Sequence, residues 1–140
     1  TYWKRSAPYP SMMMYDGVAR EVCTVRRIRT NTPLQALTTL NDSAYIDIAR
    51  NFAYRMKEKT TNPKEQISKG FKLATYKDID NKSLEALVKL YTTAYSQFKE
   101  DTSKATKIIG GKDEKASAET AALTVVANAM LNLDEVVTKN

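Results

Sequence analysis

The segment 82–99 constrains the fold more than any other, because its apolar residues recur at helical spacing. They are Leu84, Leu87, Val88, Tyr91, Tyr95 and Phe98. Counted from Leu84, offsets of three, four, seven, eleven and fourteen residues place them all on one face of an α-helix. An aromatic row of this kind is far more typical of a buried core than of a cofactor site. The segment therefore predicts a long helix packed against other helices.

Capping residues and apolar spacing predict further helices on both sides of this one. Thr32 is a good N-cap and Pro33 suits the first helical position, so a short helix is expected over 33–40, with Leu34, Leu37 and Leu40 on its buried face. The other predicted helices cover 43–58, 63–75 with Gly70 at a close helix crossing, 102–109 ended by Gly110-Gly111, and 117–132. The last is apolar nearly all round and is expected at the centre of the bundle, with 133–137 folding back or fraying.

The N-terminal residues carry a different pattern. Pro8 and Pro10 favour extended backbone around Tyr9, and Asp16-Gly17 is a turn signal. The sequence thus predicts an all-α fold, an irregular helical bundle of about five to six helices with an extended N-terminal arm. The chain reads as a single helical domain over 1–140, in which 1–30 form the arm and 31–140 the helical body.

The amino-acid composition excludes several kinds of functional site. The chain has no histidine and one cysteine, Cys23, which excludes an internal disulfide, a four-cysteine zinc site and a C-x-x-C-H haem attachment. Its carboxylates are scattered, and no base, nucleophile and orienting group share a motif. No apolar run approaches the ~18 residues of a membrane span. We expect no catalytic, cofactor or metal site here, although an enzymatic role for the chain stays open.

The candidate interaction residues lie in and beside the arm. Residues 1–30 hold six basic and two acidic residues of a chain whose net charge is +6, so attraction to anionic groups should concentrate there. Arg26, Arg27 and Arg29, followed by Thr30 and Asn31, directly precede the predicted helix start, where they could hold a carboxylate or another anion. Alternatively, they tie the arm to the helical body, which is the commoner use of arginine forks.

Aromatic residues give the arm much of its apolar surface. Trp3, Tyr9 and Tyr15 could lie across the helices and against another domain, or form a platform for a sugar or a protein partner.

Two segments resemble the signature of an uncharacterised domain family. They are YWKRSAPYPSMMMYDGVAREVCTVRRIRTNTPLQALTTLND near the start and LTVVANAMLNLDEVV near the end. The family closes large secreted or envelope proteins first noticed in planctomycetes and also found in Bacteroidetes-type bacteria, often with an upstream cytochrome-c-like module. The resemblance implies a C-terminal fragment of a larger periplasmic, cell-envelope or extracellular protein, with haem only on an upstream module.

These observations give three functional hypotheses. The leading one is a non-catalytic domain that docks other domains or subunits of its parent protein. The alternative is an accessory domain that binds or processes polysaccharide, which depends on Trp3, Tyr9 and Tyr15. A weaker alternative is polyanion binding through the arginine cluster, although the helical or RNP-type frame of nucleic-acid binders is absent and a nucleic-acid partner is disfavoured.

Overall fold

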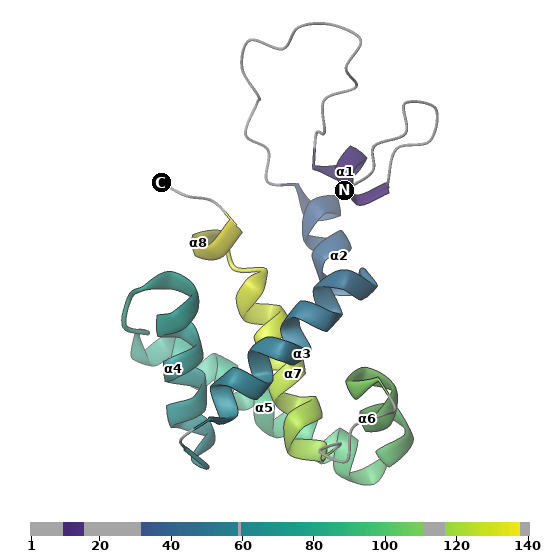
Figure 1. Ribbon diagram of the computed structural model, residues 1–140. Coiled ribbons are helices and arrows are strands. Elements are labelled where there is room, and N and C mark those ends of the chain that lie inside the picture. The colour runs from purple at the N-terminus through teal and green to yellow at the C-terminus, as the bar shows by residue number, and fades with distance from the viewer. Residues whose placement is uncertain (1–9, 16–31, 59, 111–116, 138–140) are drawn as a thin grey trace, which may run out of the picture.

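The computed structural model describes residues 10–15, 32–58, 60–110 and 117–137, and every regular element in these ranges is an α-helix. The all-α prediction is therefore confirmed for this part of the chain. Figure 1 shows the helices, which are α1 (Pro10–Met14), α2 (Pro33–Asn41), α3 (Ser43–Lys57), α4 (Pro63–Thr75), α5 (Asn81–Glu100), α6 (Thr102–Ile109), α7 (Ala118–Leu131) and α8 (Asp134–Val137).

Local hydrogen bonds explain where the helices begin. Asn62 Oδ1 accepts from Lys64 N at 3.1 Å and Asp80 Oδ2 accepts from Ser83 N at 3.0 Å, so each side chain satisfies a backbone donor that has no partner within its helix. Gly110 ends α6 with a φ of 90°, a left-handed conformation that glycine adopts without steric cost. The predicted boundaries hold to within a residue or two at these ends.

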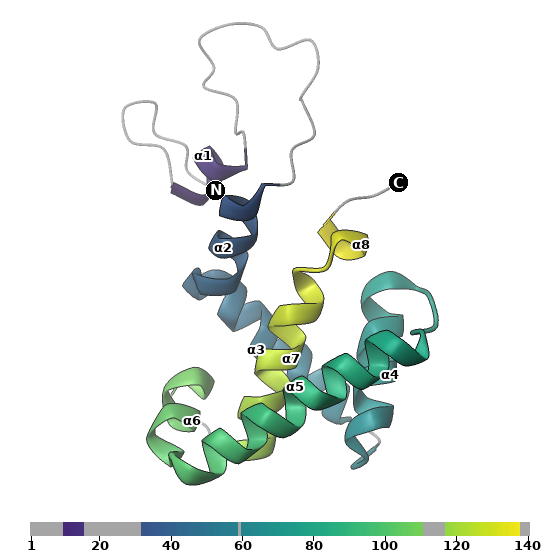
Figure 2. The same cartoon turned by 180° about the vertical axis from the view of Figure 1, so that it is seen from behind.

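Helix α7 forms the centre of the molecule. It lies between α3 and α5, which cross it on opposite sides, so that α3 is in front in Figure 1 and α5 in front in Figure 2. Ala121, Leu123, Val126, Ala127 and Met130 are fully buried. A helix that is apolar on nearly all sides can be stable in water only when neighbours cover it, and the prediction of a central position is confirmed.

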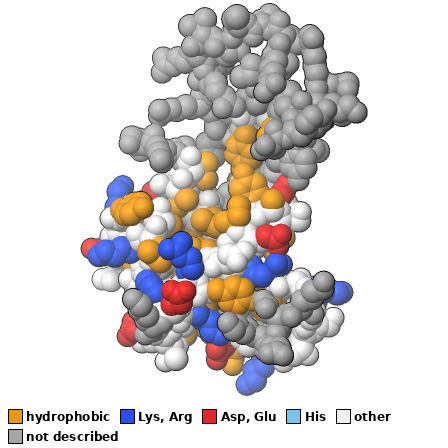
Figure 3. Space-filling view, in the orientation of Figure 1, with side chains coloured by type: hydrophobic (Ala, Val, Ile, Leu, Met, Phe, Trp, Pro, Cys, Tyr) orange, Lys and Arg blue, Asp and Glu red, His pale blue; other side chains and the backbone are white. Residues whose placement is uncertain are grey.

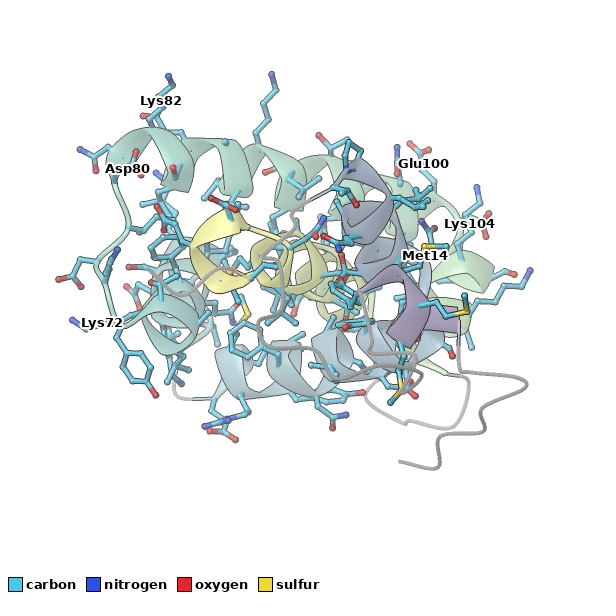
Figure 4. All side chains as sticks on the ribbon, turned by 90° about the horizontal axis from the view of Figure 1, so that it is seen from above. Met14, Lys72, Asp80, Lys82, Glu100 and Lys104 are labelled. Carbon is cyan, nitrogen blue, oxygen red and sulfur yellow. The ribbon has the colours of Figure 1, made fainter. Side chains whose placement is uncertain are left out.

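Helix α5 uses the predicted apolar row to cover α7. Leu87, Tyr91 and Phe98 are buried, and the other members of the row are half-buried against the same core. The rings of Tyr91 and Tyr95 stack with their centroids 6.0 Å apart. Burial, followed by the nearby Glu119 carboxylate, raises the pKa of the Tyr91 phenol. From above, Asp80 and Lys82 mark the start of α5 and Glu100 its end, beside Lys104 on α6 (Figure 4).

Helices α3 and α4 approach closely at Gly70. A Cβ added to Gly70 would lie 2.8–2.9 Å from three side-chain atoms of Met56, which is fully buried. The absence of a side chain at position 70 therefore leaves room for the Met56 thioether, as the predicted close crossing requires.

One helix lies inside residues 1–30, for which the sequence predicts an extended arm, and at these positions the prediction is wrong. Helix α1 begins at Pro10, and proline is well tolerated in a first helical turn because its missing N–H would have no partner there. The neighbouring arm residues 1–9 and 16–31 lie outside the described residues. None of the helices in the described ranges combines the length and apolar composition that a bilayer crossing requires.

Candidate interaction surface

Helix α2 begins with a complete capping box. Thr32 Oγ1 accepts from Gln35 N at 3.3 Å, and Gln35 Oε1 accepts from Thr32 N at 3.0 Å. Pro33 follows the cap at the first helical position, as the sequence predicted. This reciprocal pair of hydrogen bonds fixes Thr32 as the residue at which α2 begins.

The inward face of α2 is polar. Gln35 and Thr39 are only 4% and 5% exposed, although glutamine and threonine usually lie at the surface. Thr39 Oγ1 lies 2.6 Å from Asn132 Oδ1, and Gln35 Nε2 donates to Met14 O at 2.9 Å. Both buried side chains therefore have hydrogen-bond partners, as burial of polar groups requires.

Two asparagines at the C-terminal end of α7 complete the attachment of α2. Asn132 Nδ2 donates to Ala36 O at 3.4 Å, and Asn128 Nδ2 donates to Leu40 O at 3.1 Å. Residues four apart lie on one side of a helix, so both amides reach the same neighbour. Hydrogen bonds form only when donor and acceptor atoms are correctly positioned, so these bonds specify which side of α2 faces α7.

The opposite side of α2 presents three leucines to solvent. Leu34, Leu37 and Leu40 are 51%, 56% and 41% exposed. The prediction that these leucines form a buried face was wrong, because the side of α7 that α2 meets carries asparagine amides, which bond to Thr39 and to the α2 backbone instead. Figure 3 shows hydrophobic side chains gathered where α2 forms the surface. We call Leu34, Leu37 and Leu40 the leucine face.

Helix α1 lies beside α2 and adds apolar surface. Met13 and Met14 are 60% and 37% exposed, and Figure 4 shows Met14 on α1 next to α2. Tyr15 holds α1 in place, because its hydroxyl donates to Gln35 O at 3.3 Å and its ring lies 6.4 Å from that of Tyr45 at a tilt of 36°. Burial, followed by the neighbouring Tyr15, raises the pKa of the Tyr45 phenol.

Of the predicted interaction residues, the structure describes only Tyr15, which is half-buried between α1, α2 and α3. Trp3, Tyr9, Arg26, Arg27, Arg29, Thr30 and Asn31 lie outside the described residues, so their roles stay predictions. The leucine face was missed as a surface. One relevant signal was present in the sequence: PLQALTTLN contains no charged residue, so no charged face of this helix marks the side opposite the leucines as the side in contact with water.

The carboxylates of the described ranges serve mainly as caps and in surface pairs. Asp42, Asp80 and Asp101 each accept from backbone N–H groups at a helix start. Within those ranges no three residues of the types Asp, Glu, His and Cys come together as a metal site would need. The described surface therefore offers apolar contact and directed hydrogen bonds rather than a catalytic cluster.

Comparison with models of known protein families shows which family the chain belongs to. A family model described as "PSD1: Protein of unknown function (DUF1553)" matches residues 1–91 of its 140 residues. The chain belongs to the PSD1 family. The matched residues contain α1 to α4 and the first half of α5, and hence the whole leucine face, whereas α6, α7 and α8 lie beyond the match. No curated protein and no solved structure matches the chain.

Proposed function

We propose that this PSD1 chain is a non-catalytic docking domain whose leucine face binds another protein domain. The partner surface would have an apolar centre that covers Leu34, Leu37 and Leu40, and an acidic rim. The observation that carries this proposal is the inverted placement of α2, in which leucines face solvent while glutamine and threonine are buried.

The energetics of this placement favour a bound partner. Full burial of a leucine stabilises a structure by about 1.5–3 kcal/mol, and a half-exposed leucine forgoes part of that gain. A helix with three such leucines could have turned them toward α7, yet the α7 asparagines hold it the other way. The unused apolar area becomes available to a partner, and three neighbouring leucines on one helix suit a groove that receives a helix.

Charge complementarity indicates the chemistry of that partner. Helix α2 carries no charge, so the centre of the partner surface should be uncharged as well. Arg26, Arg27 and Arg29 stand three to six residues before Thr32 in the sequence. An acidic rim on the partner would meet these guanidinium groups and would speed association. We propose as the partner another domain of a larger envelope or secreted parent, such as a haem-bearing module.

The decisive experiment uses site-specific photo-cross-linking in the native parent protein. A photoreactive residue at position 37 should capture one defined protein or domain, whereas the same residue at position 93, an exposed site on α5, should not.

The captured partner is then purified, and its binding to the chain is measured by titration. We expect Leu34→Glu/Leu37→Glu to weaken its binding at least tenfold, because two carboxylates would enter an apolar contact. Thr93→Glu is the matched control and should bind normally.

Each alternative predicts a different result. Binding that survives Leu34→Glu/Leu37→Glu would overturn the proposal, as would capture of only a second copy of this chain. A captured glycan that depends on Trp3 or Tyr9 would favour the polysaccharide hypothesis. Strongly salt-dependent binding to DNA or sulfated glycan, lost in Arg26→Ala/Arg27→Ala/Arg29→Ala, would favour polyanion binding.

A further inference from the structure

A second surface feature lies away from α2, along helix α5. It is a groove of about 330 Å³, lined by Lys64 of α4 and by Asn81, Leu84, Glu85, Val88 and Lys89 of α5. The α5 residues are spaced so that they share one side of the helix, as residues three and four apart do. Figure 2 shows the helix that carries them crossing the back of the molecule beside α4.

The floor of the groove is apolar. Leu84 and Val88 pack against the core on one side and are only half-buried, so part of each side chain faces the groove. Water in contact with such a floor is released when an apolar group covers it, which favours binding. This side of α5 therefore offers a small hydrophobic contact with polar residues around it, the usual composition of a ligand site.

Two ammonium groups border this floor, and neither has a carboxylate partner among the residues that the structure describes. The ion pairs among the described residues involve Arg50, Lys57, Lys72 and Lys104, and none of them includes Lys64 or Lys89. Both lysines are exposed and flexible enough to reach a bound anion. The one acidic lining residue is Glu85, so the three ionisable side chains of the groove carry a net charge of +1.

We propose that this groove binds a small ligand with an apolar body and a terminal carboxylate. The apolar body would cover Leu84 and Val88, and the carboxylate would pair with Lys64 or Lys89. The volume lies at the small end of the ~300–1,000 Å³ typical of ligand sites, which suits a short acyl chain or one aromatic ring. This inference is independent of the docking role of α2, because it uses different residues on another side of the molecule.

Sodium octanoate tests the inference, with octan-1-ol as the uncharged probe of the same chain length. We expect millimolar octanoate to shift the amide resonances of Leu84, Val88 and their neighbours in ¹⁵N-labelled protein, in a saturable manner. Octanol should bind at the same place about three- to tenfold more weakly, because exposed ion pairs contribute modestly to affinity. Shifts that fail to saturate, or that map to the leucine face instead of α5, would overturn the proposal.

Three variants sharpen the test. Lys64→Gln/Lys89→Gln should reduce octanoate binding to the level of octanol, and Glu85→Gln should strengthen it by removing a like charge. Lys99→Gln, on an exposed part of α5 outside the groove, should change nothing. Glutamine has a helix propensity close to those of lysine and glutamate, so all variants are expected to fold, which circular dichroism checks. Equal octanoate affinity in the double variant and the wild type would refute the role of the lysines.

Discussion

At the scale of single residues, the contact between Gly70 and Met56 limits what position 70 can hold. The thioether of Met56 occupies the space where a Cβ would lie, 2.8–2.9 Å from it. Met56 is fully buried, so it can move away only by displacing other core side chains. Glycine lowers helix propensity, but tertiary packing at position 70 needs its lack of a side chain.

Substitution of Gly70 by alanine tests this contact. We expect Gly70→Ala to lower the free energy of unfolding by about 1–2 kcal/mol, because the steric conflict outweighs the ~1 kcal/mol gain in helix propensity. Urea denaturation followed by circular dichroism measures the change. In the Met56→Ala background the same substitution should become neutral or stabilising. If Gly70→Ala stabilises both backgrounds, the contact does not constrain position 70.

At the scale of the helices, N-caps determine most of the boundaries, and two of the capping aspartates, Asp80 and Asp101, have a lowered pKa. Hydrogen bonds from Ser83 hold the pKa of Asp80 below its usual value of 3.8, and those from Lys104 do the same for Asp101. A carboxylate with a lowered pKa in the folded state stabilises that state above its unfolded pKa. The contribution is lost as the pH falls through the lower, folded-state value.

These two aspartate caps predict how the free energy of unfolding changes at acidic pH. Replacing Asp80 and Asp101 by asparagine, which also caps helices, should flatten the fall in unfolding free energy below about pH 4. Chemical denaturation at a series of pH values measures the slope. Ser117→Ala provides the comparison, because the Ser117 hydroxyl caps α7 without titrating. It should lower stability by about 1 kcal/mol at every pH. An unchanged acid slope in the double asparagine variant would contradict the argument.

At the scale of the whole molecule, α7 couples the other helices into one core. Its buried residues contact those of α3, α5 and α6, so a defect in α7 should weaken the entire fold. This arrangement is consistent with the predicted single domain over 1–140, which stays a prediction until the cooperativity of unfolding is measured.

Two leucines in the same chain make a matched test of that coupling. Leu123→Ala should lower the free energy of unfolding by about 2–5 kcal/mol, because Leu123 is fully buried and its truncation leaves a cavity. Leu37→Ala, on the leucine face, should change it by less than ~0.5 kcal/mol. Thermal unfolding followed by circular dichroism and by methyl NMR should give one coincident transition in each protein. Two separated transitions would indicate more than one domain.

Much of the fold could be predicted because the signals for it are local. Thr32 with Pro33, Asn62 with Pro63, and Gly110 mark helix ends through hydrogen bonds and backbone angles that depend on neighbouring residues only. The long apolar row of α5 and the nearly all-apolar α7 likewise predicted burial, since no other placement would remove so much apolar surface from water.

What the sequence by itself determined, then, is where the helices from α2 to α7 lie and which of them is central; it predicted neither α1 nor α8. Only the tertiary structure decided which side of α2 faces inward. By spacing alone, Leu34, Leu37 and Leu40 form an apolar face that should be buried. Asn128 and Asn132, about ninety residues away, offer α2 hydrogen bonds rather than apolar contact, so Thr39 turns inward, while Gln35 on the same side of α2 bonds to Met14 O. A contact between residues so distant in the chain leaves no local trace in the sequence of either helix, and it is this contact that creates the candidate docking surface.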